Sequence, residues 1–258
     1  MSLPEGGMRA ALVTGAAQRI GAAIARDLAR HGWAVAVHYR SSGAAAESLA
    51  QEIRDAGGKA VALACDLAQE RESLELVPRA AKALGPLTLL VNNASVFEMD
   101  RIDTATRDSW DRHIETNLRA PLVLSQAFAR QLPEGALGNI VNMLDQRVWK
   151  LTPYFLSYTV AKCGLWTLTQ TMALALAPHI RVNGIGPGPT LPSRRQSAEQ
   201  FQRQQSAVPL QRGPGLEEIA AAVRFILSTP SLTGQMMALD GGEHLGWAQS
   251  ARGFIARE

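Results

Sequence analysis

Short apolar runs alternate with amphipathic stretches along the whole chain, and this alternation limits the folds that the sequence can adopt. Such runs are typical of strands that are buried on both faces, as they are in parallel sheets. Strands that alternate with helices predict an α/β fold, in which one parallel sheet has helices on both faces. We therefore expect a single domain over residues 8–258, after a flexible lead-in at residues 1–7. The runs lie at residues 9–13, 33–38, 59–64, 87–91, 137–143, 180–183 and 236–239.

Composition restricts the partners of the chain. No apolar run reaches the ~20 residues that cross a membrane, and the N-terminus lacks the basic and apolar regions of a signal peptide. The formal net charge is only +3, and the basic residues form no stripe with interleaved aromatic residues, which disfavours nucleic-acid binding. Two cysteines give no disulfide framework, and the five histidines lack metal-ligand spacing. We expect a cytoplasmic protein that acts on a small molecule and binds no metal.

A glycine-containing turn follows the first strand. The segment Thr14–Gly21 joins this strand to a helical pattern at Ala22–His31. Gly15 permits a tight turn, Gly21 allows close packing, and the free N–H groups of the helix N-terminus suit a pyrophosphate. The usual middle glycine is replaced by Arg19. This context predicts a dinucleotide-binding loop, although an ordinary turn between a strand and a helix would look similar.

The residues after the second strand favour NADP over NAD. A carboxylate that would bind the adenosine ribose of NAD is absent, and residues 38–42 are His-Tyr-Arg-Ser-Ser. Arg40 and Arg19 can bind a 2′-phosphate through charge-assisted, bidentate hydrogen bonds. A solvated loop arginine is the alternative interpretation of Arg40.

Polar or glycine-rich segments also follow the later strands, at the end where ligands bind in open α/β sheets. Asp66 follows the third strand and could contact adenine or cap the next helix. Asn92 and Asn93 follow the fourth strand, where their amides can fix a turn. Residues 184–190 are rich in Gly and Pro, so their backbone can approach a ligand closely. The polar segment 191–215 suggests a mobile lid.

Asn117 and the pair Tyr158 and Lys162 are further candidates. Asn117 lies in an apolar helical stretch, where asparagine usually needs a special hydrogen bond or a local break. Tyr158 and Lys162 share one face of the helix expected at Pro153–Pro178. A lysine ammonium placed there would lower the pKa of the tyrosine and make it a proton donor near neutral pH. The same spacing also occurs by chance in helices that pack a tyrosine and expose a lysine.

In combination, the motifs resemble those of the short-chain dehydrogenase/reductase family. They are TGAAQRIG (14–21), NNAS (92–95), Asn117, YTVAK (158–162), GPGPT (186–190) and LDGG (239–242). The resemblance implies a Rossmann-type sheet of seven strands and a homotetramer. It also implies that Tyr158 donates a proton, that Lys162 holds the ribose hydroxyls and lowers the tyrosine pKa, and that Asn117 supports a water relay. Thr190 would contact the nicotinamide carboxamide.

Asp145 departs from the family pattern, in which a serine hydroxyl at this position steadies a substrate carbonyl. A carboxylate would repel the alkoxide that develops from a ketone, so Asp145 argues against ordinary carbonyl reduction unless it is protonated. Ser157 cannot replace the missing serine, because its helical position points about 100° away from Tyr158. Simple loss of function is the alternative.

Within the family, the pteridine reductases share Arg19, the segment from Asn92 to Phe97, and the Asn-Met-x-Asp pattern that ends at Asp145. By this resemblance, Phe97 and the nicotinamide would sandwich a pterin ring, while Ser95 and Arg19 would bind its polar edge or the cofactor phosphates. Asp145 and Tyr158 would handle protons while NADPH delivers a hydride to a C=N bond. A carboxylate suits the N–H donors of a pterin.

We therefore expect an NADPH-dependent reductase of a pterin or dihydropterin, such as a dihydrofolate-like compound. The alternatives are a reductase of another carbonyl or imine substrate and a non-catalytic NADP-binding protein. The predicted catalytic residues are Asn117, Asp145, Tyr158 and Lys162, and the predicted substrate-binding residues are Ser95, Phe97, Asp145 and Tyr158. The predicted cofactor-binding residues are Gly15, Arg19, Ile20, Gly21, Tyr39, Arg40, Ser41, Asp66, Leu67, Asn93, Ala94, Ser95, Pro187, Gly188 and Thr190.

Overall fold

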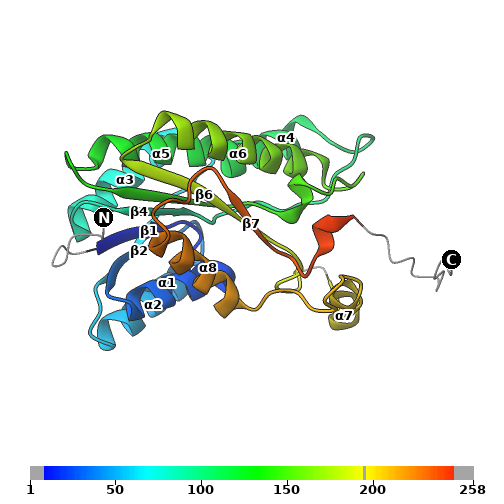
Figure 1. The fold of residues 1–258 in the computed structure, drawn as a ribbon, viewed down its shortest axis with the longest axis horizontal. Helices are drawn as coiled ribbons and strands as arrows, with labels where there is room; N and C mark the ends of the chain where they lie inside the picture. Colours follow the sequence, from blue (N-terminus) through cyan, green and yellow to red (C-terminus); the bar gives the residue numbers. More distant parts are fainter. Residues whose placement is uncertain (1–8, 194–195, 247–258) are drawn as a thin grey trace.

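A seven-stranded parallel sheet runs through the centre of the described residues, 9–193 and 196–246, of the computed structural model (Figure 1). The strand order is β3-β2-β1-β4-β5-β6-β7. This arrangement confirms the predicted α/β fold with a Rossmann-type sheet. The predicted lead-in at residues 1–7 lies outside the described residues. The strands are β1 (Arg9–Val13), β2 (Trp33–Tyr39), β3 (Ala60–Ala64), β4 (Leu89–Asn92), β5 (Gly138–Met143), β6 (Ile180–Pro187) and β7 (Met236–Leu239).

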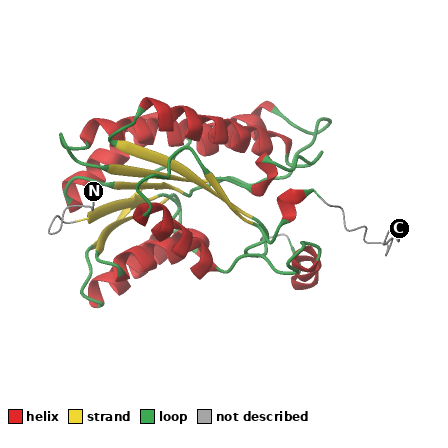
Figure 2. Cartoon of the chain, viewed as in Figure 1, coloured by secondary structure: helices red, strands yellow, loops and turns green. Residues whose placement is uncertain are grey.

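Helices cover both faces of the sheet, so that the fold has three layers (Figure 2). One layer contains α1 (Arg19–Arg30), α2 (Gly43–Asp55) and α8 (Leu216–Ser228), and the other contains α3 (Glu70–Leu84), α5 (Ala120–Gln131) and α6 (Leu156–Ala175). Successive side chains of a strand point to opposite faces. In β1, Ala11 and Val13 pack toward α1, while Ala10 and Leu12 belong to the core on the other face. Both faces are buried, which explains why the strands are mainly apolar.

The helical stretch around Asn117 contains the local break that its composition suggests. Helix α4 (Arg107–Ile114) leads into a π-helical turn at Glu115–Arg119, and α5 continues from Ala120. Asn117 lies in this turn and has no exposed surface. A π turn inserts one residue into a helix and redirects the side chains that follow. The sequence-based expectation of a break at Asn117 is confirmed.

The polar segment 191–215 contains a helix that the sequence analysis did not identify. Helix α7 (Ala198–Ser206) begins with a capping box, in which the Ser197 hydroxyl accepts the Gln200 N–H at 3.2 Å and the Gln200 side chain accepts the Ser197 N–H at 2.9 Å. None of its residues is buried. Helix α7 is therefore not part of the core, although Val208, which follows it, is only 2% exposed. The role of segment 191–215 as a mobile lid stays a prediction.

The strand order reverses between β1 and β4. The chain proceeds from β1 outward to β3 on one side, and from β4 outward to β7 on the other. Loops that leave the carboxyl ends of β1 and β4 therefore diverge, and ligands of open α/β sheets bind in the crevice between such loops. This end of the sheet faces α7 on the right-hand side of Figure 1.

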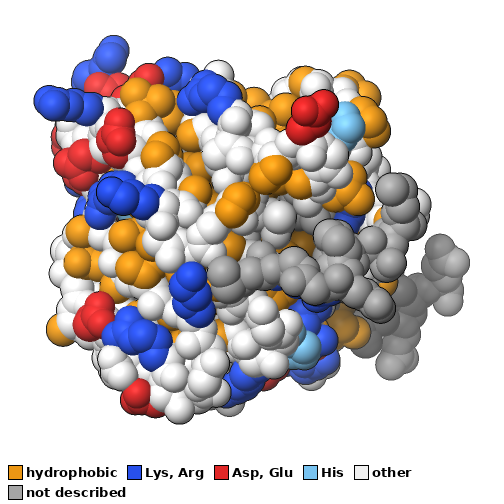
Figure 3. All heavy atoms as spheres, turned by 90° about the vertical axis from the view of Figure 1, so that its left-hand side faces the viewer, with side chains coloured by type: hydrophobic (Ala, Val, Ile, Leu, Met, Phe, Trp, Pro, Cys, Tyr) orange, Lys and Arg blue, Asp and Glu red, His pale blue; other side chains and the backbone are white. Residues whose placement is uncertain are grey.

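At the opposite end of the molecule, around the amino ends of the strands, basic and acidic side chains lie intermingled with apolar ones on the surface (Figure 3). Within the described part of the chain, no helix combines the length and the apolar character that crossing a membrane requires.

Candidate active site

A cavity of about 380 Å³ lies where the loops after β1, β2 and β4 meet. It brings together most of the residues that the sequence analysis assigns to cofactor binding. Those at this cavity are Gly15, Arg19, Ile20, Gly21, Tyr39, Arg40, Ser41, Asp66, Leu67, Asn93, Ala94 and Ser95. Arg19 and Arg40 are exposed at its rim.

Two residues of the glycine turn adopt left-handed backbone conformations. Gly15 has φ 61°, which glycine adopts without steric cost. Arg19 has φ 57°, although it carries a side chain. A Cβ atom at Gly21 would lie 2.4 Å from the Gly15 carbonyl oxygen, so the turn and the helix pack as closely as predicted. Arg19 thus adopts a conformation that glycine takes up more readily.

His38 holds this turn in place, and the sequence analysis did not identify it. Its Nδ1 accepts the Gly15 N–H at 2.9 Å, and its Nε2 lies 3.0 Å from the Cys65 carbonyl oxygen. A backbone N–H can only donate, so Nδ1 carries no proton and Nε2 donates to Cys65. Burial lowers the pKa of His38 to about 4, against a smaller opposing effect of the Cys65 hydrogen bond. The ring is therefore neutral at physiological pH.

Two asparagines connect the loop after β4 to its surroundings. The Asn93 side chain donates to the Thr14 carbonyl oxygen at 2.7 Å, and the Asn93 backbone N–H donates to the Thr14 hydroxyl at 2.9 Å. Asn117 accepts the Val96 N–H and donates to the Val96 carbonyl oxygen, both at 2.8 Å. Asn117 thus makes the special hydrogen bond expected of it, whereas the Asn93 amide joins the loop after β4 to the turn after β1. The water relay assigned to Asn117 stays a prediction.

Asp66 does not cap the next helix, which is one of the two roles that the sequence leaves open for it. Its Oδ1 accepts the Ala68 N–H at 3.1 Å, whereas α3 begins after Gln69. Asp66 thus stabilises its own loop and borders the 380 Å³ cavity.

A second cavity, of about 240 Å³, lies beyond the first and shares Arg19, Ile20, Asn93 and Ser95 with it. Three predicted cofactor residues, Pro187, Gly188 and Thr190, border this second cavity. The predicted substrate and catalytic residues at the same cavity are Ser95, Phe97, Asp145, Tyr158 and Lys162.

Tyr158 and Asp145 form the central contact of the second cavity. The Tyr158 hydroxyl donates to Asp145 Oδ2 at 2.8 Å, and Asp145 Oδ1 accepts the Arg147 backbone N–H at 2.9 Å. The Lys162 ammonium donates to the Met143 carbonyl oxygen at 2.6 Å. Tyr158 is 5% exposed and Lys162 is 2% exposed, so both lie in a largely dry environment.

The predicted lowering of the tyrosine pKa is wrong for this structure. Burial, followed by the charge of Asp145 and its hydrogen bond, raises the pKa of Tyr158 well above its ordinary value. Lys162 lies 5.7 Å from the centre of the Tyr158 ring, and Met143 holds its ammonium. Burial lowers the pKa of Lys162 to about 8, against a smaller opposing effect of Asp145. Tyr158 therefore retains its proton at neutral pH and shares it with Asp145.

Phe97 lies at the mouth of the second cavity in an aromatic stack that the sequence analysis did not foresee. Its ring stacks on Phe155, with centroids 4.3 Å apart, and meets the edge of the Tyr158 ring at 4.7 Å. The Arg147 guanidinium lies 5.6 Å from the Phe97 centroid and 5.0 Å from that of Phe155. One face of Phe97 is therefore covered by protein.

Six further polar residues border the second cavity without having been predicted, namely Gln146, Arg147, Ser193, Gln196, Gln204 and Glu243. Gln146 and Arg147 follow Asp145, and Glu243 comes from the turn after β7. Burial raises the pKa of Glu243, while Arg147 and Lys150 oppose this shift. The position of Gln146 and Arg147 next to Asp145 was a usable sequence signal, whereas that of Glu243 depends on the tertiary fold. Among the described residues, no group of three or more His, Cys, Asp or Glu side chains is placed to hold a metal ion.

Comparisons with known proteins identify the family. A family model described as short chain dehydrogenase matches residues 9–203. The chain belongs to the short-chain dehydrogenase family. The predicted family is thus confirmed, and with it the assignment of the chain to the oxidoreductases.

Members of this short-chain dehydrogenase family resemble the chain over nearly its full length. FolM alternative dihydrofolate reductase 1 from Brucella suis, whose crystal structure contains NADP, has a TM-score of 0.90 and 50% identity, covering 93% of this chain and 96% of that chain. An uncharacterized oxidoreductase from Methylorubrum extorquens is 35% identical, covering 94% of this chain and 99% of the relative. The 3-oxoacyl-(acyl-carrier-protein) reductase FabG of Staphylococcus epidermidis is 30% identical, and the match covers 92% of this chain and 99% of the relative.

Proposed function

We propose that the protein is an NADPH-dependent reductase that transfers a hydride to a C=N bond of a pterin or dihydropterin. The observation that carries this proposal is the contact between the Tyr158 hydroxyl and the Asp145 carboxylate, 2.8 Å apart in the second cavity. The pair offers a proton donor next to an acceptor. A pterin ring needs both, because it carries N–H groups beside the nitrogen that gains a proton during reduction.

The first cavity fits a dinucleotide phosphate. The backbone of Gly15 and the close packing at Gly21 leave room beside the N-terminus of α1, where N–H groups attract anions. Arg19 and Arg40 border the same cavity and are exposed, so their guanidinium groups can bind a 2′-phosphate. NADPH supplies the hydride when it is bound. The roles of the cofactor residues named above belong to this proposal.

The residues of the second cavity bind the substrate and transfer the proton. Asp145 accepts hydrogen bonds from the substrate N–H groups, and the Tyr158 hydroxyl faces the nitrogen that is protonated. Tyr158 keeps its proton because burial and Asp145 raise its pKa. The buried Lys162 ammonium holds ribose hydroxyls and can return a proton to Tyr158. Phe97, which is 42% exposed, stacks on the pterin ring, and Ser95 binds the polar edge of that ring.

The names of the relatives support this proposal but differ in substrate. The 50%-identical Brucella suis protein is called an alternative dihydrofolate reductase, whereas the 30%-identical FabG protein is a 3-oxoacyl reductase. A carboxylate beside Tyr158 opposes the negative charge that develops on a ketone oxygen, so Asp145 favours the pterin. Reduction of another carbonyl or an imine is the second candidate, and an imine would also benefit from Asp145.

Consumption of NADPH with a panel of substrates tests the proposal. We expect turnover with dihydrofolate and dihydrobiopterin, little turnover with simple ketones, and a preference for NADPH over NADH. Asp145→Ser should reduce pterin turnover and leave ketone turnover equal or higher. Turnover of ketones without turnover of any pterin would contradict the proposal.

We further propose that the protein is a cytoplasmic homotetramer. An apolar groove of about 390 Å³ lies between the π turn and α6, bordered by Leu118, Leu122 and Leu168 among others. On the same face of α6, Val160 and Leu174 are 43% and 83% exposed. Large exposed apolar surfaces of this kind are typical of interfaces, and a second copy of the chain would cover it.

A further inference from the structure

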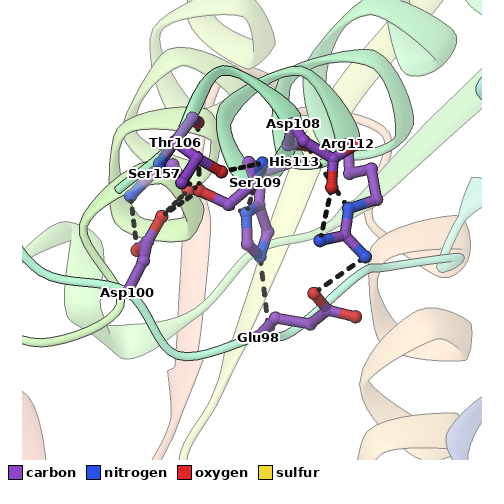
Figure 4. Close-up of polar contacts among 8 residues, drawn as sticks. All are labelled: Glu98, Asp100, Thr106, Asp108, Ser109, Arg112, His113 and Ser157. Atoms are coloured by element: carbon purple, nitrogen blue, oxygen red, sulfur yellow. Dashed lines mark hydrogen bonds and ion pairs between the residues drawn. The ribbon is translucent and has the colours of Figure 1, made fainter. Parts of the chain in front are cut away.

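A buried polar cluster, drawn in Figure 4, contacts the Tyr158 ring through His113, and its members border neither cavity. It joins the loop after β4 to α4 and α6 through Asp100, Ser109, His113 and Ser157. Asp100 is 3% exposed, and His113 and Ser157 have no exposed surface. Burying a carboxylate is costly unless hydrogen bonds compensate it. The proposed chemistry uses none of these side chains, so their arrangement needs another explanation.

The cluster contains the residue types of a serine hydrolase triad, but its connections are different. In such a triad the carboxylate orients the histidine, which takes the serine proton. Here the Ser157 hydroxyl donates to the Asp100 carboxylate. His113 Nε2 accepts the Glu98 N–H at 3.1 Å, so the ring proton lies on Nδ1, which is 2.8 Å from Ser157 Oγ. The nitrogen beside the serine is already protonated and also lies 2.8 Å from the Ser109 carbonyl oxygen, so His113 cannot accept the serine proton as the base of a triad does.

Asp100 caps helix α6 from a distant part of the sequence. Phe155 precedes the helix with φ 59° and offers no side-chain cap. Asp100 Oδ1 instead accepts the Ser157 N–H at 3.1 Å, and the Asp100 carbonyl oxygen accepts the Leu156 N–H at 3.3 Å. A negative charge at this end of a helix is also favoured by the helix dipole.

Asp100 retains its charge despite its burial. Burial alone would raise its pKa, but hydrogen bonds from Ser157 and Ser109 outweigh this effect, so the pKa lies below its ordinary value. The Ser109 hydroxyl contacts Asp100 Oδ2 at 3.0 Å. The contact ties α4 into the same cluster, which therefore links three elements.

Phe97 and Tyr158 both border the substrate cavity, and the cluster contacts the residue next to each of them in sequence. His113 binds the backbone of Glu98, which follows Phe97, and Asp100 binds Ser157, which precedes Tyr158. The His113 ring also meets the Tyr158 ring edge to face, with centroids 6.1 Å apart. Displacement of any member would therefore be transmitted to Phe97 or Tyr158.

We propose that Asp100, His113 and Ser157 are positioning residues, which hold Phe97 and Tyr158 in one fixed arrangement across the substrate cavity. The inference rests on the proposed role of Tyr158 as the proton donor. Loss of one link lets the loop after β4 and the first turn of α6 move independently, and the Tyr158 hydroxyl loses its alignment. A misplacement of about 1 Å can lower a rate about 100-fold. The cofactor cavity is bordered by none of the three residues and stays intact.

Ser157→Ala tests the proposal, and Ser125→Ala is its matched control. Ser125 is 2% exposed, its hydroxyl donates to the Pro121 carbonyl oxygen at 2.6 Å, and it borders neither cavity. Ser157→Ala loses the two buried hydrogen bonds of its hydroxyl, to Asp100 and His113, and Ser125→Ala loses one, so thermal stability should fall in both variants and further in Ser157→Ala. Ser157→Ala should lower kcat for a dihydropterin about 10- to 100-fold, with the Kd of NADPH unchanged. The kcat of the control variant Ser125→Ala should lie within about twofold of the wild-type value. Equal kcat values in the two variants would overturn the proposal.

Hydrogen exchange followed by mass spectrometry provides a readout that needs no substrate. Peptides that cover residues 95–105 and 153–162 should exchange faster together in Ser157→Ala, while peptides from α2 keep their protection. Unchanged exchange in both peptides would overturn the positioning role even if pterin turnover is found. A wild-type protein that reduces no pterin but shows this coupled change in the variant would contradict only the proposed function. If Ser157→Ala fails to fold, Asp100→Asn gives the same comparison with the shape of the side chain retained.

Discussion

At the scale of single residues, the protonation states of Tyr158 and His38 are set by burial more than by charged neighbours. Tyr158 has a raised pKa and His38 a lowered one, and in both cases burial is the largest cause. Each group is therefore neutral near pH 7. For Tyr158 this preserves a transferable proton, and for His38 it preserves an acceptor for the Gly15 N–H.

Tyr158→Phe should remove the proton donor and leave the fold intact. We expect kcat with a dihydropterin to fall about 10²- to 10⁴-fold, the usual range for general acid catalysis. The Kd of NADPH, measured by fluorescence titration, should change little, because Tyr158 does not border the first cavity. Tyr154→Phe is the matched control, since Tyr154 is 46% exposed and borders neither cavity. Equal activity in the two variants would rule out the assigned role.

His38 should make stability depend on pH in a defined window. Its pKa is lowered to about 4 in the folded state, from an unfolded value of 6.5, so its contribution is complete above pH 6.5 and is lost as the pH falls toward 4. As the pH falls from 7 to 5, His38 gains a proton in the unfolded state but not in the folded state, and the unfolding free energy falls by about 2 kcal/mol. Urea unfolding should therefore show a smaller decrease over this range in His38→Gln, which cannot titrate. Parallel pH profiles of the two proteins would contradict this assignment.

At the scale of elements, the packing of α1 against the turn after β1 tolerates no side chain at Gly21. In Gly21→Ala the new Cβ would lie 2.4 Å from the Gly15 carbonyl oxygen and 2.6 Å from Asn93 Nδ2. We expect a loss of about 1–3 kcal/mol of unfolding free energy, typical of overpacking, together with weaker NADPH binding. Gly215→Ala is the control, because its Cβ would meet only carboxylate atoms of Glu217 and Glu218, at 3.4 Å or more. Thermal unfolding with and without NADPH measures both effects, and equal losses in the two variants would contradict the packing argument.

Helices and strands were predictable from the sequence where the local pattern of apolar and polar residues determines them. Buried parallel strands are apolar on both faces, so β1 and β4 were found from composition alone. The break at Asn117 was also predictable, because a polar residue inside an apolar helix needs a partner. In contrast, α7 was missed because its polarity masked the Ser197 and Gln200 capping box.

The candidate site was predictable to the extent that its residues lie in local motifs. Tyr158 and Asp145 were identified from their positions in such motifs, and the fold brings them into contact. The role of His38 depends on a contact with Gly15, 23 residues away, which no local pattern reveals. The upward shift of the Tyr158 pKa also depends on burial, which is a property of the complete fold.

At the scale of the whole molecule, the exposed apolar face of α6 predicts association. Light scattering of the wild-type protein should give about four times the chain mass of 27.7 kDa. Leu174→Glu places a charge on this face, where Leu174 is 83% exposed, and should shift the population toward smaller species. Ile102→Glu is the control, since Ile102 is 87% exposed in the loop after β4 and outside α6. A monomeric wild-type protein, or equal effects of the two substitutions, would contradict the predicted interface.

Arg19 combines a left-handed backbone, with φ 57°, and a cation at the rim of the first cavity. A residue with a side chain is strained in this conformation by about 1–2 kcal/mol, and glycine would relieve that strain. Glycine would also remove the guanidinium that is proposed to bind the cofactor phosphate. Thermal stability and cofactor affinity therefore place opposite demands on position 19. Laboratory evolution for heat resistance alone should enrich Arg19→Gly, whereas selection under limiting NADPH should eliminate it.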